Sequence, residues 1–280
     1  MKTFCIAGRY GDIIIALSAF KYLSEKSGQK VPVITSSKFG DIFDGVSYVQ
    51  RIAMPNQTGE EDDFMKEYIR SHPAKILRWW MAGDKPEEDW KDIPTGKDEV
   101  CFRGKKWILN FQKWPNYQTS LFDRTGVPIE MMNTLPLVFD RRDKKRESEL
   151  VKEATKKNKK NLPLLLYNFS GHSSPFAAMP EVMNRLDKYR GQFFFIDLAN
   201  YQCHRIYDLL GLMDVAKLLI TIDTSTLHLA AASPVRQICY LNQGWSSSVP
   251  KGNVLCTIRY KNAVKNLDKL EFFVQSSLNT

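Results

Sequence analysis

Two short stretches of the sequence combine acidic, hydroxyl and imidazole side chains where an apolar run gives way to a helical pattern. The first is Gly11-Asp12. The second consists of Asp223, Thr224, Ser225, Thr226 and, two residues later, His228. Backbone N–H groups at the start of a helix favour anions, and hydroxyls add hydrogen-bond donors. The second stretch therefore predicts a phosphate-binding turn. The alternative is a plain helix cap with a packed histidine.

Asp12 stands at the start of an apolar segment, residues 13–26, whose spacing is helical. A carboxylate at the start of a helix is favoured in its anionic form, which suits a proton acceptor but lowers its basicity. Taken alone, this position is also typical of a residue that caps the helix.

Alternating strand and helix patterns surround these stretches. In the first half, strand patterns lie at 3–7, 31–35 and 48–52, with a helical pattern at 13–26. In the second half, strand patterns lie at 162–167, 192–197, 218–222 and 237–241, with helical patterns at 180–189, 204–213, 226–232 and 267–278. This order predicts an α/β fold with two doubly wound parallel sheets, whose ligands bind at the carboxyl ends of the strands.

We expect a first domain at 1–140 and a second at 161–280, joined by a basic linker or helix at 141–160. This joining segment holds ten Lys/Arg against four Asp/Glu, a net +6 of the formal +9. It is either solvated or a patch that contacts a polyanion. The last helix could pack back on the first domain. The aromatic-rich region 57–133 suggests core or interdomain packing, with a surface on which a substrate stacks as the alternative.

Several classes of protein are disfavoured by the sequence. No apolar stretch approaches the roughly 20 residues of a membrane helix, so we expect a cytoplasmic protein with at most a peripheral membrane contact. The five cysteines are scattered and the histidines are four, which predicts neither a disulfide framework nor a metal site. Nothing in the sequence indicates an oligomeric state.

The first turn also argues against two common nucleotide-binding classes. Gly8 and Gly11 are spaced as Gly-x-x-Gly, which is neither a Walker sequence nor the dinucleotide Gly-x-Gly-x-x-Gly. Kinase and dehydrogenase functions therefore lose most of their support.

The stretch 222–232 resembles the donor-site signature of the heptosyltransferase-type glycosyltransferases, the lipopolysaccharide heptosyltransferases and their relatives. In that family an Asp-Thr-Gly, followed by a His and small residues, closes a strand–helix turn around the diphosphate of a nucleotide sugar. Asp223, Thr224 and His228 match this pattern, whereas Ser225 replaces the usual Gly. The stretch 11–23 is similar to the family's opening Gly-Asp and apolar helix.

The resemblance implies roles for individual residues. Asp12 would be the general base at the interdomain cleft, next to Gly11. A third stretch follows the strand pattern at 162–167 and matches the family loop that contacts donor phosphates: Ser170, Gly171, His172, Ser173 and Ser174. The family's Lys before a Trp-Pro is replaced by Ala177-Ala178-Met179-Pro180, so backbone, hydroxyls and His172 would meet the phosphate charge. The alternative is a serine-rich turn without a ligand.

The resemblance further implies a GT-B-like fold, in which two Rossmann-like domains face each other across a cleft. The implied reaction is an inverting, metal-independent transfer of a sugar from a nucleoside diphosphate to an acceptor hydroxyl of a lipopolysaccharide or another glycan. The nucleotide sugar is a co-substrate, and no cofactor is implied. A phage-type DNA glycosyltransferase acting on hydroxymethylated bases remains an alternative. A non-catalytic nucleotide-binding relative is another alternative. The resemblance implies a bacterial protein, or one that acts in the host cytoplasm if it is phage-encoded.

Overall fold

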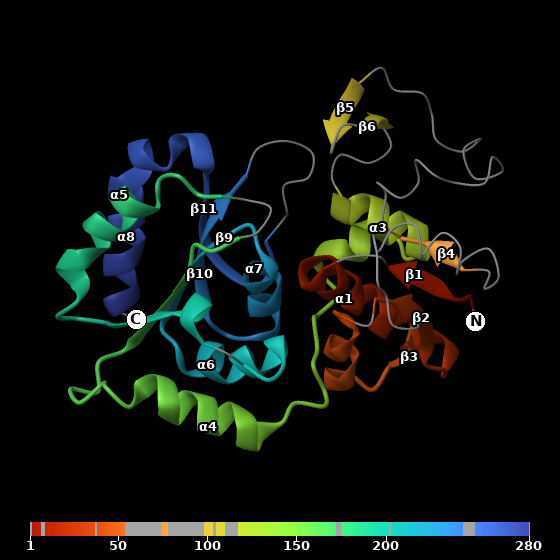
Figure 1. Ribbon diagram of the computed structural model, residues 1–280, viewed down its shortest axis with the longest axis horizontal. Coiled ribbons are helices and arrows are strands. Elements are labelled where there is room, and N and C mark those ends of the chain that lie inside the picture. Colours follow the sequence, from red (N-terminus) through yellow and green to blue (C-terminus); the bar gives the residue numbers. More distant parts are fainter. Residues whose placement is uncertain are drawn as a thin grey trace. The chain divides into compact units, whose positions relative to one another are not determined.

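The computed structural model describes residues 2–6, 9–36, 38–53, 74–77, 98–102, 105–109, 117–171, 175–201, 203–242 and 250–279. The chain divides into two compact units, Met1–Arg141 and Arg142–Thr280. Each unit is built from strands and helices around a parallel sheet, which confirms the predicted α/β class (Figure 1).

In the first unit, the described residues form a parallel sheet in the order β3-β2-β1-β4. Its strands are β1 (Phe4–Ile6), β2 (Val31–Thr35), β3 (Val49–Ala53) and β4 (Lys75–Ile76). Helix α1 (Tyr10–Ser27) joins β1 to β2, as the sequence predicts. It ends where Gly28 adopts a left-handed φ of 68° and donates its N–H to the Ser24 carbonyl at 2.9 Å.

The buried half of α1 holds this unit together. Every residue from 13 to 20 is buried, because this half of the helix is apolar and contacts both the sheet and α3 (Tyr117–Thr125). A separate antiparallel hairpin is made by β5 (Asp98–Phe102) and β6 (Lys105–Leu109). The side chains of the tryptophans in the aromatic-rich region, at positions 79, 80, 90, 107 and 114, lie outside the described residues.

The second unit has a parallel sheet in the order β11-β10-β9-β7-β8. Its strands are β7 (Leu164–Asn168), β8 (Phe194–Asp197), β9 (Leu218–Ile222), β10 (Arg236–Leu241) and β11 (Asn253–Arg259). Its helices are α4 (Lys144–Thr155), α5 (Met179–Leu186), α6 (Leu210–Val215), α7 (Ser225–Leu229) and α8 (Leu267–Leu278). Strand β11 is not among the predicted strands, because its half-exposed pattern mixes apolar residues with Thr257 and Arg259.

Helices cover both faces of this second sheet (Figure 1). On one face, Ile238 and Tyr240 of β10 pack with residues of α5 and α8. On the other face, Cys239 of the same strand packs against Leu227 of α7. The alternation along β10 is that of a strand buried on both sides. The buried residues of α8 belong to the core of the second unit, so this helix completes that unit.

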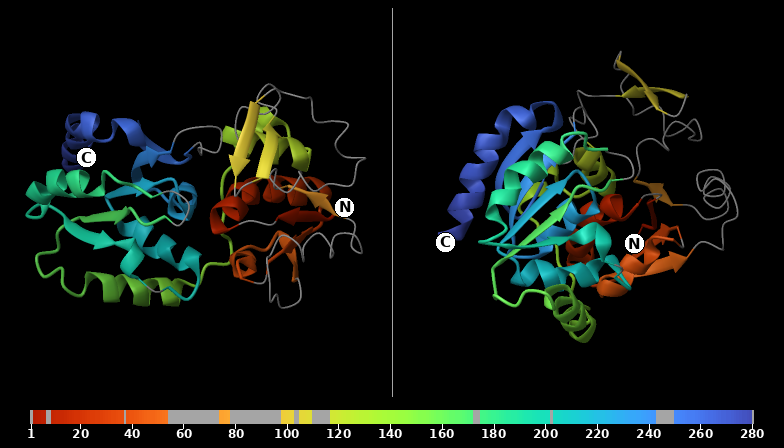
Figure 2. Two further views of the ribbon diagram at one scale, coloured as in Figure 1. Left: turned by 45° about the horizontal axis from the view of Figure 1, so that its top comes forward. Right: turned by 60° about the vertical axis from the view of Figure 1, so that its left-hand side comes forward.

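The first part of the basic segment is fixed by ion pairs inside the second unit. Arg142 Nε lies 2.6 Å from Glu147 Oε1, and Arg142 Nη2 lies 2.5 Å from Asp214 Oδ2. Arg146 Nε lies 3.2 Å from Asp208 Oδ2. Glu147 and Asp208 are buried, so these pairs hold α4 against α6 and the turn before it (Figure 2). This half of the segment is an ordered helix and not a free linker.

The last part of the basic segment, which we call the lysine turn, is ordered but differs in its charges. The Asn158 side chain donates to the Leu162 carbonyl at 2.8 Å and accepts the Leu162 N–H at 3.0 Å. The turn consists of this asparagine and the exposed Lys156, Lys157, Lys159 and Lys160. None of these lysines forms an ion pair with another residue that the structure describes.

Candidate functional site

The carboxyl ends of β7 and β9 place polar residues side by side in the second unit. The two strands are neighbours in the sheet, and their register pairs Asn168 with Thr221. Both side chains are polar, yet both are buried. Each follows a run of apolar residues in its strand. A polar residue at the end of a buried strand points to a ligand or to a specific internal partner, because burying an unsatisfied polar group is costly.

The internal partner is Thr226, in the turn that the sequence predicts to bind phosphate. Its Oγ1 lies 2.9 Å from Thr221 Oγ1 and 2.8 Å from Thr224 Oγ1, and it accepts the side-chain amide of Asn168 at 3.2 Å. Asn168 also accepts the N–H of Ser170 at 2.9 Å. One network therefore connects the turn after β9, which we call the donor turn (residues 223–228), with the loop after β7.

The predicted donor residues are not equivalent in this network. Thr226 is buried and its hydroxyl is engaged within the protein, whereas Asp223, Thr224 and Ser225 are half-exposed. Thr224 is the threonine that reaches from the network to the accessible side of the turn. Two members, Asn168 and Thr221, were not among the candidate site residues. Taken together, their signal in the sequence is a polar residue within the last two positions of each of two adjacent apolar strands.

Helix α7 is shorter than the sequence predicts. The expected helix at 226–232 is an α-helix at Ser225–Leu229 that tightens into a 3₁₀ turn at Ala230–Ala232. Thr224 precedes it in an extended conformation, and its side chain makes no capping hydrogen bond. So short a helix has a small dipole, so an anion at this turn would depend mainly on hydroxyl and backbone N–H groups.

His228 is buried in the last turn of α7. Burial lowers the pKa of its imidazole to about 3, and the positive charge of Lys251 acts in the same direction. Burial also lowers the pKa of Lys251, to about 8. The imidazole is thus neutral at neutral pH, so it can hydrogen-bond within the turn but brings no positive charge to it.

Both ends of the loop after β7 are anchored by aromatic packing. The rings of Phe169 and Phe176 stack at 5.5 Å, and Phe176 packs on Tyr240 of β10 at 4.8 Å. Ser170 is exposed and Gly171 half-exposed just after the first anchor. The other predicted members of the loop, His172, Ser173 and Ser174, lie outside the described residues.

Asp12 lies in the first unit, in the first turn of α1 beside Gly11. It is the third residue of the helix, and its Oδ2 accepts the N–H of Arg9 at 2.9 Å. The capping role considered for Asp12 is therefore real, but Arg9, and not Asp12, is the N-cap. The carboxylate is half-exposed, at the carboxyl end of β1 where ligands of parallel sheets bind.

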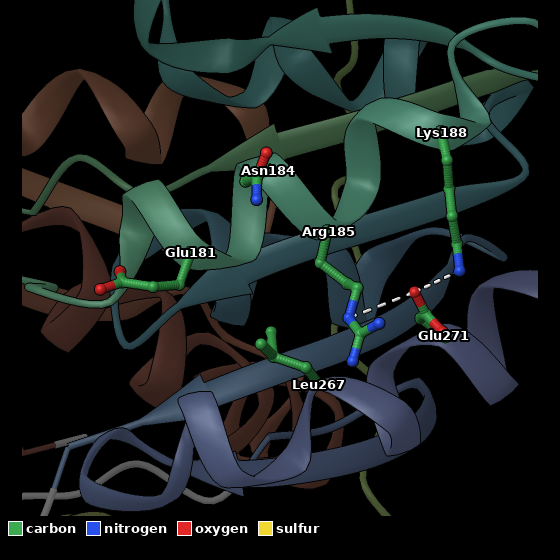
Figure 3. A pocket seen from close by; sticks show the side chains of 6 residues that line it. All are labelled: Glu181, Asn184, Arg185, Lys188, Leu267 and Glu271. Atoms are coloured by element: carbon green, nitrogen blue, oxygen red, sulfur yellow. Dashed lines mark ion pairs between the residues drawn. The ribbon is translucent and has the colours of Figure 1, made fainter.

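One pocket of the second unit, of about 360 Å³, lies apart from the donor turn (Figure 3). It is lined by Glu181, Asn184 and Arg185 of α5, by Lys188 of the turn that follows, and by Leu267 and Glu271 of α8. Arg185 Nε lies 3.3 Å from Glu271 Oε1, and Arg185 Nη2 lies 2.7 Å from Asp268 Oδ1. These pairs join the two helices, so we interpret the pocket as part of their packing.

The described residues contain neither a membrane-spanning helix nor a metal-binding cluster. No helix there has the length and apolar character that a membrane crossing requires. No group of three or more His, Cys, Asp or Glu side chains there is arranged to hold a metal ion.

Comparison with known proteins gives relatives at the level of structure. No protein-family model and no curated protein sequence matches this chain. Among solved structures it is similar to ADP-heptose lipopolysaccharide heptosyltransferase II of E. coli, with a TM-score of 0.62 and 12% identity, over 99% of this chain and 98% of that one.

Two further structures agree. A family 9 glycosyl transferase from Veillonella parvula has a TM-score of 0.60 and 11% identity, over 96% of this chain and 89% of that one. The E. coli heptosyltransferase WaaC with ADP has a TM-score of 0.52 and 13% identity, over 99% of both chains. The resemblance inferred from the two motifs is thereby confirmed for the fold: this chain has the GT-B-type fold of the heptosyltransferases.

Proposed function

We propose that this protein is a glycosyltransferase that takes its sugar from a nucleoside-diphosphate donor. The observation that carries the proposal is the donor turn. Its half-exposed Thr224 and Ser225 follow a buried strand, in a chain that matches heptosyltransferase structures along almost its whole length. Hydroxyl and backbone donors aimed at the diphosphate would stabilise the charge that develops as the nucleoside diphosphate leaves.

Residue roles follow from the chemistry of each unit. Asp12 accepts the proton of the acceptor hydroxyl, and its carboxylate is half-exposed and held by a backbone N–H. Thr224, Ser225 and Asp223 line the donor turn, while Thr226 and the neutral His228 support it from inside. Ser170 and Gly171, with His172, Ser173 and Ser174, contact the phosphates from the loop after β7.

We propose a single displacement without a metal ion, which inverts the configuration at the sugar. The acceptor is a glycan hydroxyl of the lipopolysaccharide type, as the names of the similar structures suggest. The lysine turn supports a second candidate, a DNA acceptor, because its four lysines are exposed and have no acidic partner among the described residues.

A thermal-shift screen of nucleoside diphosphates and nucleotide sugars tests the proposal. ADP is the first ligand to try, because one of the similar structures contains it. A ligand that binds only the folded protein stabilises it by about 2.7 kcal/mol at a hundredfold excess over its dissociation constant. Stabilisation by at least one nucleoside diphosphate, with release of that diphosphate from its sugar, supports the proposal. A protein that responds to none of them is not this enzyme.

A further inference from the structure

In the hydrogen-bond network behind the donor turn, each hydroxyl either donates or accepts toward its neighbour. The direction of these hydrogen bonds decides whether the turn offers a phosphate a proton or a lone pair. We propose that Asn168 is a positioning residue of the donor site. By holding Thr226 as an acceptor, it frees the Thr224 hydroxyl to donate its proton to the diphosphate. The inference rests on the proposed donor function. It adds Asn168 to the donor site and assigns a direction to the hydrogen bonds behind Thr224.

The orientation of the Asn168 side chain follows from its partners. The Ser170 backbone N–H can only donate, so the atom 2.9 Å away must be the carbonyl oxygen Oδ1 of Asn168. The Nδ2 group then faces Thr226 Oγ1 at 3.2 Å, and an amide NH₂ can only donate. Thr226 Oγ1 therefore accepts the hydrogen bond from Asn168, irrespective of its contacts with the other two hydroxyls.

The hydroxyls of Thr221, Thr226 and Thr224 form a chain that we call the relay. Because each hydroxyl has a single proton, the number of protons limits which of them can donate. Thr226 Oγ1 has one proton and two other hydroxyl neighbours, Thr221 at 2.9 Å and Thr224 at 2.8 Å. If Thr226 donates to Thr224, the proton of Thr224 is left to point away from the network. If Thr224 donates inward instead, its lone pairs point outward and would repel an anion.

An anion at the turn selects the first arrangement. Thr226 then accepts from Asn168 and donates to Thr224. The Thr221 hydroxyl can donate to Thr226 Oγ1 at 2.9 Å or to the Ile222 carbonyl at 3.2 Å, and either choice leaves the proton of Thr226 for Thr224. Hydrogen bonds in such a chain polarise one another, which strengthens the outermost donor. Thr221 and Thr226 are at most 3% exposed, so water does not compete for these positions.

Replacing Asn168 by aspartate tests the direction of these hydrogen bonds. An ionised aspartate accepts only, so Thr226 must donate to it, and Thr224 must in turn donate inward. Inorganic pyrophosphate is the probe, because it tests the diphosphate site without a choice of base or sugar. We expect Asn168→Asp to weaken its binding to the full-length protein by about 10- to 100-fold, the usual loss for a hydrogen bond to a charged group.

Asn266→Asp is the control. Asn266 also donates its side-chain amide within the protein, to the Asn262 carbonyl at 2.8 Å, but it is the N-cap of α8 and belongs neither to the donor turn nor to the lysine turn. We expect this variant to bind pyrophosphate as the parent does. Equal weakening of both variants would show a general effect of lost stability and would overturn the inference.

A double variant separates the relay from simple charge repulsion. In Asn168→Asp with Thr226→Val, no hydroxyl at 226 claims the proton of Thr224, so we expect affinity to recover roughly fivefold or more relative to Asn168→Asp alone. Repulsion by the aspartate charge predicts no recovery, and that result would contradict the relay.

Thr224 provides a test that does not disturb the buried residues. Thr224→Val should lose about tenfold or more in pyrophosphate affinity, and Thr224→Ser should restore it. Unchanged binding in Thr224→Val overturns the inference while leaving the proposed function standing, provided that the parent binds a nucleoside diphosphate. If the parent binds neither pyrophosphate nor any nucleoside diphosphate, both fail together.

Discussion

The carboxyl ends of the two sheets present polar residues in different ways. In the first unit, Asp12 stands on an 18-residue helix and accepts a backbone N–H from Arg9. In the second, Thr224 stands before a five-residue helix and is backed by the buried Thr226 and Asn168. A proton acceptor needs a carboxylate in a fixed place, whereas a surface of hydroxyls needs buried partners that set the direction of each proton. We therefore expect the carboxyl end of the first sheet to serve the reaction and that of the second sheet to serve binding.

The largest effect should come from Asp12→Asn, because this change deletes the proton acceptor. We expect sugar transfer to fall by about 10² to 10⁴ fold, the usual contribution of general base catalysis. Donor affinity and stability should stay at the parental values, since the amide oxygen of asparagine can still accept the Arg9 N–H. Transfer rates and donor titrations of the variant measure both.

Asp140→Asn is the control for this prediction. Asp140 also accepts a backbone N–H, from Ser47 at 2.7 Å, and also lies in the first unit. It should transfer sugar at the parental rate. Parental activity in Asp12→Asn would refute the base assignment, and an unfolded variant would favour a purely structural role for Asp12.

The second effect is a pH dependence that belongs to the second unit. The pKa of His228 in the folded protein, about 3, lies below its ordinary value of 6.5. Between these values the unfolded chain binds the additional proton, so the free energy of unfolding falls as the pH is lowered from 6.5 towards 3. His228 contributes a slope of at most about 1.4 kcal/mol per pH unit.

Denaturant titrations of the parent and of His228→Gln measure this slope. The difference in unfolding free energy between them should change steadily across the acidic range and be constant above pH 6.5. A difference that is the same at every pH would mean that His228 titrates normally. The assignment of a buried, neutral imidazole to the donor turn would then be wrong.

A smaller effect should follow from removing a buried hydroxyl at the carboxyl end of the second sheet. Thr221→Val leaves Thr226 without one partner and should lower the unfolding free energy by about 1–2 kcal/mol. It should also weaken pyrophosphate binding. Thr35→Val is its match in the first sheet, because the buried Thr35 donates to the Ile6 carbonyl at 3.1 Å. That variant should lose similar stability and bind pyrophosphate as the parent does.

The smallest effect is expected from the lysine turn. If the acceptor is a glycan, reversing its four lysines to glutamate should change sugar transfer by less than about twofold, because surface charges contribute little. If the acceptor is DNA, the same change should weaken DNA binding and flatten its salt dependence by up to about 0.9 per lost phosphate contact. Reversing four exposed lysines elsewhere controls for net charge: Lys30, Lys261, Lys265 and Lys269.

The fold could be predicted where the sequence pattern is local and strong. The predicted strands at 31–35 and 218–222 and the predicted helix at 267–278 have the observed bounds. Their apolar runs end at clear turn residues, so neighbouring elements hardly affect them. Strand β11 was missed because its exposed positions carry polar residues, and only pairing with β10 makes it a strand.

The candidate site could be predicted in part for a similar reason. The turn at 223–228 carries its own signal of consecutive hydroxyls after an apolar strand. Asn168 and Thr221 carry no such signal individually, because their meaning depends on the register between two strands, and the two paired residues lie 53 positions apart in the chain. The inward engagement of Thr226 follows from that register as well, and not from its neighbours in sequence.

Hydrogen exchange of the full-length protein tests most directly whether the donor binds at the second sheet and not at the first. The nucleoside diphosphate that stabilises the protein best is added at saturation, and amide protection is compared with that of the free protein. We expect added protection in residues 164–171 and 221–232, with little change in α1. Protection confined to α1 and the first sheet, or none in the donor turn, would contradict the assignment of donor binding to the second unit.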